Sequence, residues 1–203
     1  MGREFIWVGL VGIIISCITS DVLGCTCIHH PQYMFCRSNF VFVGKVQSKE
    51  FVKGTPPDPG DNKAIWKYRI KLITRIKGLS NVAIGSSVEI QTPGNDGLCG
   101  VTLTVGKRYI LSGTNKNGKR TVISCDIIAE EGNLSFEQMS YLFATNSNSY
   151  SSNCACEVVP KDSNSVVSSS SGCRVPDDEE CYFKTALCIR QNGSCKWINA
   201  DCS

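Results

Sequence analysis

The chain has 203 residues, of which 42% are hydrophobic, and its 21 basic and 18 acidic side chains give a formal net charge of +3. A balance this small gives no electrostatic reason to expect a nucleic-acid partner. The 13 cysteines indicate a disulfide-linked protein of an oxidising, extracellular compartment rather than a cytosolic one.

The chain opens with the pattern of a secretory signal peptide. Arg3 precedes an apolar run over residues 5–18, which is short against the roughly 20 residues of a membrane-spanning helix. Val22 and Gly24 occupy the positions three and one before a cleavage site. We therefore expect residues 1–24 to be a removed signal peptide and the product to be secreted, with no membrane span.

Cleavage after Gly24 makes Cys25 the first residue of the mature chain. Cys17 leaves with the leader, so 12 cysteines remain, an even number that suits six disulfides. The mature chain keeps 20 basic and 16 acidic side chains, a formal charge of +4.

The mature chain begins "CTCIHHPQYMFC", which brings together the side chains Cys25, Cys27, His29 and His30. Thiolates and imidazoles bind zinc or copper, but this spacing differs from that of common zinc sites. In a secreted protein each cysteine is better explained as half of a disulfide, and adjacent histidines as solvated surface. The same reasoning disfavours a nucleophilic cysteine, and no Ser-His-Asp pattern stands out.

Strand patterns dominate the next part of the chain, after a short helix expected from Pro31 to Asn39. In "IWKYRIKLITRIK" apolar and basic residues alternate, which is typical of a strand with one buried face. Asn117-Gly118 is a strong hairpin signal, and the proline-rich loop Gln47–Asn62 is long for a hairpin and is expected to project in an ordered way. Five antiparallel strands, expected to close into a small barrel, are assigned to residues 40–46, 65–77, 86–92, 107–113 and 120–125.

A second helix is expected from Phe136 to Ala144, because Ser135 and Gln138 form a capping box before a buried stripe. Apolar residues then disappear before "CAC" at 154–156. The stretch from Cys156 to Ser203 holds six cysteines and a serine-rich loop, and it is too small and too polar to have a core without cross-links. The predicted fold class is α+β, mainly β.

Two N-glycosylation acceptor patterns occur in the mature chain. They begin at Asn133, in "NLS", and at Asn192, in "NGS". Both asparagines are therefore candidate modification sites.

The cysteine pair at the mature terminus raises a chemical question, because chain termini normally fray. A free α-amino group has a pKa near 8 and is partly neutral at physiological pH. Together with the carbonyl oxygen of the same residue, it forms a five-membered chelate on a metal that has an open coordination position. A catalytic zinc has such a position where its nucleophilic water is bound. A rigid Cys25 therefore favours a zinc enzyme as the partner.

The residues after the leader resemble the tissue inhibitors of metalloproteinases over nearly the whole mature chain. The fragments "CTC", "HPQ", "CGVTLTVGKRYILSG", "ISCD", "CAC" and "CIRQNGSCKW" follow one another in the order of that family. The resemblance implies an N-terminal netrin-like domain with an OB-like five-stranded closed barrel and flanking helices, residues 25–154. It also implies a small disulfide-rich C-terminal domain, residues 155–203.

The resemblance further implies a non-enzymatic inhibitor of zinc metalloproteinases that has no cofactor of its own. Cys25 would chelate the zinc of the target, and Thr26 would enter the pocket for the substrate residue after the scissile bond. The rest of the implied inhibitory edge is Cys27, Ile28 and His29 on the primed side of the cleft, and Gly97, Leu98, Cys99 and Gly100 on the unprimed side. The implied partners are matrix metalloproteinases and related adamalysin-type enzymes, each bound by one inhibitor monomer.

The resemblance also implies a set of disulfides. The C-terminal part of this set departs from the family pattern, because a closely spaced cysteine pair of the family is absent here. The implied disulfides are Cys25–Cys99, Cys27–Cys125, Cys36–Cys154, Cys156–Cys195 and Cys181–Cys188, with Cys173 and Cys202 as the remaining pair. A tryptophan-containing segment of the family is replaced by "IIAEEGN". The main alternative function is a netrin-like binding module without inhibitory activity.

Overall fold

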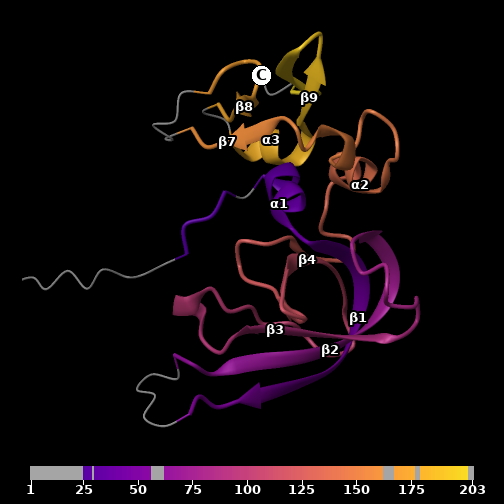
Figure 1. Ribbon diagram of the computed structural model, residues 1–203, viewed down its shortest axis with the longest axis vertical. Helices are drawn as coiled ribbons and strands as arrows, with labels where there is room; N and C mark the ends of the chain where they lie inside the picture. The colour runs from indigo at the N-terminus through magenta and orange to yellow at the C-terminus, as the bar shows by residue number, and fades with distance from the viewer. Residues whose placement is uncertain (1–24, 29, 56–61, 162–166, 177–178, 201–203) are drawn as a thin grey trace, which may run out of the picture.

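A closed barrel of five strands forms the larger part of the computed structural model (Figure 1). The structure describes residues 25–28, 30–55, 62–161, 167–176 and 179–200. Around the barrel the strand order is β1-β2-β3-β5-β4, β4 pairs back to β1, and β6 extends the sheet beyond β4. The strands are β1 (Phe40–Val52), β2 (Ile65–Lys77), β3 (Ser87–Pro93), β4 (Arg108–Lys116), β5 (Lys119–Thr121) and β6 (Ile128–Glu130). The predicted mainly β barrel is confirmed.

One pair of strands in the barrel is parallel, so the prediction of five antiparallel strands is wrong in this detail. β3 and β5 pair in parallel through Gln91 and Thr121, whereas the other pairs are antiparallel. The reason is one of parity: when an odd number of strands alternates in direction around a closed ring, two neighbours must point the same way. The expected hairpin at Asn117-Gly118 is present, and both residues have the positive φ that this turn requires.

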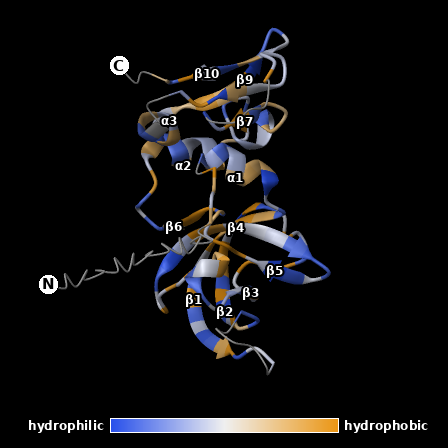
Figure 2. Cartoon of the chain, turned by 90° about the vertical axis from the view of Figure 1, so that its left-hand side faces the viewer, coloured by the Kyte–Doolittle hydropathy of each residue, from blue (hydrophilic) through white to orange (hydrophobic). Residues whose placement is uncertain are grey.

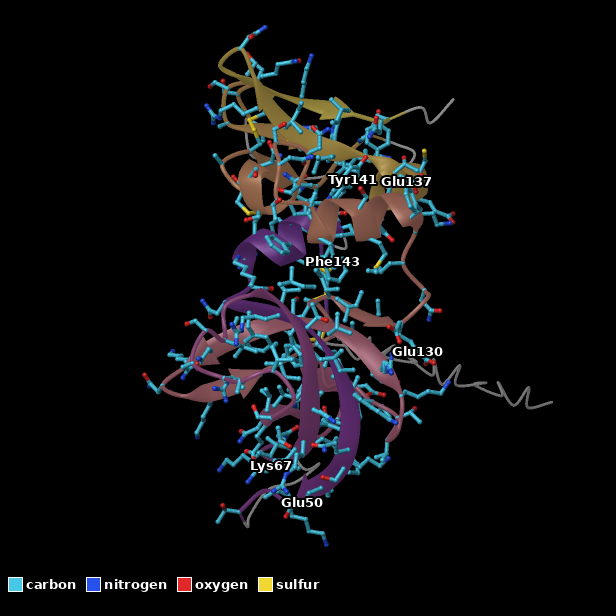
Figure 3. All side chains as sticks on the ribbon, turned by 90° about the vertical axis from the view of Figure 1, so that its right-hand side faces the viewer. Glu50, Lys67, Glu130, Glu137, Tyr141 and Phe143 are labelled. Atoms are coloured by element: carbon cyan, nitrogen blue, oxygen red, sulfur yellow. A yellow bond between two sulfur atoms is a disulfide. The ribbon has the colours of Figure 1, made fainter. Side chains whose placement is uncertain are left out.

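The first two strands are longer than predicted and form a projecting hairpin. The predicted loop Gln47–Asn62 begins too early, because β1 continues to Val52 and pairs with β2 along its length. A cross-strand contact between the Phe51 and Trp66 rings, 4.8 Å apart, extends the packed part of the hairpin. Glu50 and Lys67 are also cross-strand partners near the end of this hairpin (Figure 3).

The barrel closes because the first part of β1 pairs with β2 on one side and with β4 on the other. β1 has three register irregularities against β2, and one of them adjoins Gly44. A Cβ atom at Gly44 would lie 2.5 Å from the Ile70 side chain and 2.7 Å from the Phe42 ring. Only glycine therefore allows β1 to approach β2 this closely at this position.

Two helices cover the end of the barrel that faces the C-terminal part (Figure 1). These helices are α1 (Pro31–Arg37) and α2 (Phe136–Phe143), and the predicted capping box of α2 is present at Ser135 and Gln138. Buried side chains from both helices, from the outer face of the barrel and from the C-terminal part form one apolar layer: Phe35, Val41, Val43, Ile110, Ile127, Tyr141, Leu142, Tyr150 and Leu187. This layer joins the two ends of the molecule.

The C-terminal part is small, and its buried core consists largely of disulfide-bonded cysteines, as its composition predicts. It lies above α1 and α2 in Figure 2, on the side of these helices away from the barrel. Its elements are β7 (Glu157–Val159), β8 (Gly172–Arg174), α3 (Glu179–Thr185), β9 (Leu187–Gln191) and β10 (Ser194–Ile198). Four of its cysteines are buried in one cluster: Cys156, Cys173, Cys188 and Cys195. Cross-links therefore replace the apolar core that so short a segment lacks.

Two of the expected C-terminal disulfides are wrong. Cys156–Cys195 forms as expected, but Cys173 is joined to Cys188. This bridge contradicts both Cys181–Cys188 and Cys173–Cys202. Cys181 is itself disulfide-bonded, and Cys202 lies outside the described residues. The physical reason is that β8 and β9 both enter the buried cluster, whereas Cys181 lies on α3 at its edge.

The fully buried Gln32 of α1 connects the barrel side to the C-terminal part. Its amide nitrogen donates to the carbonyl oxygens of Cys188 and Asn153, at 2.8 and 3.1 Å, and its amide oxygen accepts from the Cys188 N–H at 2.9 Å. One side chain thus satisfies the backbone of β9 as a neighbouring strand would. Within the described ranges, no helix is long and apolar enough to cross a membrane.

Candidate functional site

The first described residues, Cys25 to Ile28, are held by two disulfides to separate loops. Cys25 is bridged to Cys99 at a sequence separation of 74, and Cys27 is bridged to Cys125 at a sequence separation of 98. In the chain-entropy account, each disulfide that closes a loop of this length stabilises the folded state by about 4–5 kcal/mol, because it restricts the unfolded chain. Thr26, between the two bridges, is exposed. The segment is therefore fixed at both ends while its central side chain faces solvent.

Cys99 follows a tight turn that forms a ridge beside this segment. The turn is the short 3₁₀ helix η1 (Asp96–Leu98), and the Asn95 side chain caps it by accepting from the Leu98 N–H at 2.9 Å. Cys99 ends the turn in the left-handed conformation, with φ 65°. Leu98 is 42% exposed. The ridge thus presents an apolar side chain next to the bridged segment.

The ridge is anchored to the barrel core directly after Gly100. The Val101 N–H donates to the Thr92 hydroxyl at 3.0 Å, and the buried Tyr68 hydroxyl lies between the Val101 carbonyl and the Leu103 N–H. Burial raises the pKa of Tyr68, so this hydroxyl keeps its proton. Tyr68 comes from the predicted buried face of β2, but its part in positioning the ridge has no signal in the sequence.

A backbone hydrogen bond links the two loops that receive the disulfides. The Ser124 N–H donates to the Cys99 carbonyl at 3.0 Å. Ser124 directly precedes Cys125 in the chain. The two disulfides and this hydrogen bond therefore close a small ring of which Cys25, Thr26 and Cys27 form one side. Sequence reasoning missed Asn95 and Ser124; the run Asn95-Asp96-Gly97, typical of a capped turn, was an available signal for the first.

His30 connects the bridged segment to α1. It is fully buried, its Nδ1 atom accepts from the Gln32 N–H as the helix cap, and its ring packs against those of Phe183 and Trp197. Burial lowers the pKa of His30 to about 4, and backbone carbonyls of Tyr182 and Ala186 partly offset this effect. The expectation that His30 is solvated surface is therefore wrong.

The far end of α1 is fastened to the barrel and to the segment after α2. The Lys77 ammonium group donates to the carbonyl oxygens of Phe35 and Cys36 at 2.8 and 3.1 Å. Cys36 is also bridged to Cys154. Both ends of α1 are thus held, and the edge that precedes it is attached to a rigid element.

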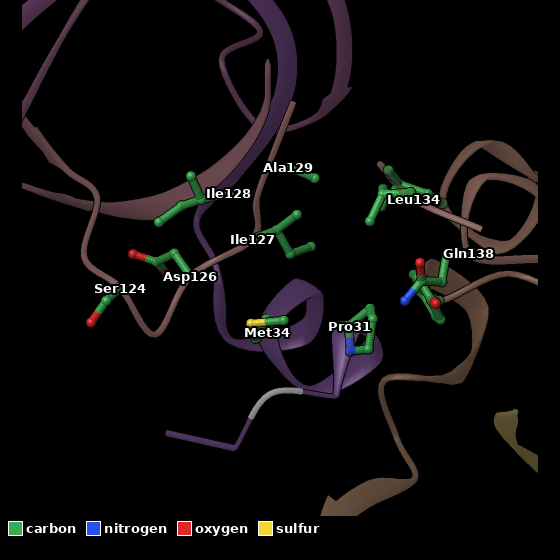
Figure 4. Close-up of a pocket in the computed structure, with 11 residues that line it drawn as sticks. Pro31, Met34, Ser124, Asp126, Ile127, Ile128, Ala129, Leu134 and Gln138 are labelled. Carbon is green, nitrogen blue, oxygen red and sulfur yellow. The ribbon is translucent and has the colours of Figure 1, made fainter. Parts of the chain in front are cut away.

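A cavity of about 270 Å³ lies behind the edge, between α1, the segment around Ile127 and α2 (Figure 4). Asp126 lies in its wall, opposite Met34, and accepts a hydrogen bond from the Ile123 N–H at 2.8 Å. Burial raises the pKa of Asp126 from 3.8 to about 6, although this hydrogen bond and the charge of Arg37 favour the ionised form. A carboxyl group one residue from Cys125 therefore has its pKa raised to about 6.

The other residues of the predicted inhibitory edge differ in their exposure to solvent. Gly97 is exposed and Ile28 is partly buried. His29 lies outside the described residues. Cys25 and Cys27 are disulfide-bonded rather than free thiols, and no cluster of three metal-binding side chains occurs in the part of the chain that the structure describes.

Comparison with known proteins gives one consistent family. Residues 23–197 match the family described as tissue inhibitor of metalloproteinase. Metalloproteinase inhibitor 4 of Mus musculus is 32% identical over 138 residues, which cover 66% of this chain and 58% of the relative. Metalloproteinase inhibitor 3 of Xenopus laevis is 30% identical over 145 residues, or 70% and 62% of the two chains.

A third relative is matched over a greater length. Metalloproteinase inhibitor 3 of Scyliorhinus torazame is 28% identical over 191 residues, which cover 85% of this chain and 80% of the relative. The first two relatives are each covered over less than two thirds of their length.

Two glycines of the ridge offer a matched test of its packing. A Cβ atom at Gly100 would lie 2.4 Å from the Pro93 carbonyl oxygen and 2.6 Å from that of Asn95, whereas one at Gly97 would meet nothing closer than 3.6 Å. Gly100→Ala should lower the free energy of unfolding by about 1–3 kcal/mol, because backbone must move. Gly97→Ala should change it little. Denaturant unfolding measures the free energy of unfolding of both variants. Equal values for Gly100→Ala and Gly97→Ala would contradict the close packing at Gly100.

The raised pKa of Asp126 predicts a pH dependence of stability. The folded state holds this proton more tightly than the unfolded state, so the stabilising contribution is present below the ordinary pKa of 3.8 and is lost as pH rises through about 6. Asp126→Asn keeps an oxygen acceptor for Ile123 but does not titrate. The free energy of unfolding of the wild type should fall relative to that of the variant between these pH values. Parallel curves would show that Asp126 does not titrate there.

Proposed function

The chain belongs to the family of tissue inhibitors of metalloproteinases, and we propose that it is a secreted inhibitor that blocks the active site of zinc metalloproteinases of the matrix metalloproteinase type. The single observation that carries the proposal is the pair of disulfides that holds Cys25 and Cys27 on either side of the exposed Thr26. The proposal includes removal of residues 1–24 as a signal peptide, which leaves Cys25 as the first residue.

The chemistry of inhibition is assigned to the mature terminus. The α-amino group of Cys25, with an ordinary pKa near 8, supplies a lone pair to the catalytic zinc of the target. The carbonyl oxygen of Cys25 completes a chelate. Together they occupy the coordination position in which the target enzyme activates its nucleophilic water. The target then lacks the nucleophile for peptide hydrolysis.

The neighbouring residues are assigned to the substrate cleft of the target. Thr26 enters the pocket for the substrate residue after the scissile bond, and Cys27, Ile28 and His29 follow along the primed side. The ridge of Gly97, Leu98, Cys99 and Gly100 lies on the unprimed side. An exposed Leu98 suits this assignment, because an apolar side chain gains from burial in the complex.

Rigidity supports tight binding in this scheme. A free chain terminus would lose conformational entropy when it enters a protein cleft, and this loss would oppose binding. The bridges to Cys99 and Cys125, with the hydrogen bond from Ser124 to Cys99, impose that loss during folding. The inhibitor then binds as a monomer, one per enzyme, and the same geometry suits matrix metalloproteinases and the related adamalysin-type enzymes.

Thr26→Gly tests the pocket assignment. The variant keeps both bridges and the chelating residue but removes a methyl group and a hydroxyl group, which contribute on the order of 1–3 kcal/mol when buried. Inhibition should weaken by roughly ten- to a hundredfold, as measured by titration against a panel of matrix metalloproteinases. Thr145→Gly, at an exposed threonine in the loop after α2, is the control. Unchanged inhibition by Thr26→Gly across the panel would remove Thr26 from the pocket.

A one-residue extension tests the chelate itself. An alanine placed before Cys25 converts the amine into an amide nitrogen, which has no usable lone pair for zinc, and the added residue collides with the metal. Inhibition should fall by several orders of magnitude. Thermal unfolding and the absence of free thiols should stay as in the unextended protein, because the extension lies at an exposed edge. Equal inhibition by the two forms would favour a netrin-like binding module instead.

A further inference from the structure

An open groove of about 580 Å³ lies between β6, α2 and α3, on the barrel side of the C-terminal part. Its apolar wall includes Ile128, Leu134 and Phe183. Its polar lining includes Gln138 and the ion pair between Lys184 and Glu180, whose charged atoms lie 2.6 Å apart. Asn133, the first residue of the "NLS" pattern, lines the same groove and is exposed. A candidate glycosylation site is therefore both exposed and part of the groove lining.

Phe136 directly follows Ser135, a residue of the groove lining, along the chain. It is the first residue of α2 and is 83% exposed, the highest value among the exposed large hydrophobic residues of the described chain. Helical side chains tilt toward the N-terminal end of their helix, so Phe136 extends toward the turn that carries Asn133. An exposed phenyl ring one residue from the groove lining adds apolar surface that a bound group can cover.

We propose that Asn133 carries an N-linked glycan whose first sugars lie in this groove and cover Phe136. Sugar rings have an apolar face of C–H bonds, which suits the Phe136 ring and the side chains of Leu134 and Phe183. Their hydroxyl and acetamide groups can hydrogen-bond to the exposed Lys184–Glu180 ion pair. The inference rests on the proposed function in one respect, which is that the chain enters the secretory pathway.

The transfer is that of any N-linked glycan. The Asn133 amide nitrogen loses a proton and forms a bond to the anomeric carbon of a lipid-linked pyrophosphoryl oligosaccharide, whose C–O bond breaks and whose pyrophosphate leaves with the electron pair and accepts the proton. In the folded chain the Ser135 hydroxyl donates to the Lys184 carbonyl and accepts from the Gln138 N–H. The transfer therefore precedes folding of α2 against α3.

The second acceptor pattern provides an internal control. Asn192 and Gly193 form the turn between β9 and β10, both with positive φ, and the residues from Gln191 to Ser194 are exposed and polar or glycine. A glycan at Asn192 would cover no apolar groove. Ser194→Ala removes this pattern without changing the left-handed residue Asn192, and Asn133→Gln removes the first pattern without changing the Ser135 helix cap.

The test starts from the full chain secreted by a glycosylating host. Enzymatic release of glycans in heavy-oxygen water followed by peptide mapping identifies each occupied asparagine. We expect Asn133 to be occupied, and Asn133→Gln to lose the mass of one glycan. An unmodified Asn133 in the secreted protein would overturn the inference. If the native leader fails to direct secretion, a heterologous leader placed before Cys25 delivers the same mature chain to the same test.

A second measurement tests what the glycan covers. Binding of a hydrophobic fluorescent dye should rise severalfold in Asn133→Gln and return to the wild-type level in Asn133→Gln/Phe136→Ser, whereas Ser194→Ala should leave it unchanged. A glycan whose loss leaves dye binding unchanged would overturn the covering role. Titration of the same samples against a metalloproteinase keeps the two proposals apart: glycan absent with inhibition intact contradicts only this inference, and the reverse contradicts only the proposed function.

Discussion

Two disulfides, one residue apart, are the constraint on which the rest of the structure depends. Cys25 and Cys27 are tied to loops that are themselves joined by the Ser124–Cys99 hydrogen bond. Any movement of the segment between them must therefore break a covalent bond or distort both loops. The barrel holds the loop of Cys99 through Tyr68 and Thr92. It thereby serves as the frame for the segment from Cys25 to Cys27. The proposed inhibition needs such a frame, because a chelating terminus is useful only if it is already in place.

The helix that follows the edge passes this rigidity to the other half of the molecule. α1 is capped by the buried His30, paired through Gln32 to the backbone of β9 and fastened at its end by Lys77. Each of these polar side chains satisfies backbone groups that would otherwise be buried without partners. The edge and the barrel are consequently linked to the disulfide-rich C-terminal part by hydrogen bonds and by a shared apolar layer.

Local signals predicted the local structure well. The capping box of α2, the Asn117-Gly118 turn and the alternating β2 all depend on neighbouring residues, which a sequence displays directly. The predictions were wrong where the structure depends on residues that are distant in sequence. The parallel β3–β5 pair follows from closing an odd-numbered ring, and the Cys173–Cys188 bridge depends on which strands meet in a core formed only after folding. His30 shows the same limit, since its burial comes from Phe183 and Trp197, far along the chain.

In the proposed mechanism, a disulfide-held Cys25 is the first residue of the active protein and carries a free amine. Mass spectrometry of the intact secreted protein, combined with N-terminal sequencing, shows directly whether it does. We expect a chain that starts at Cys25, with an unmodified α-amino group and every cysteine oxidised. A chain that starts at any other residue while it inhibits a metalloproteinase with full strength would contradict this mechanism, and so would a blocked amine at Cys25 in the fully inhibitory protein.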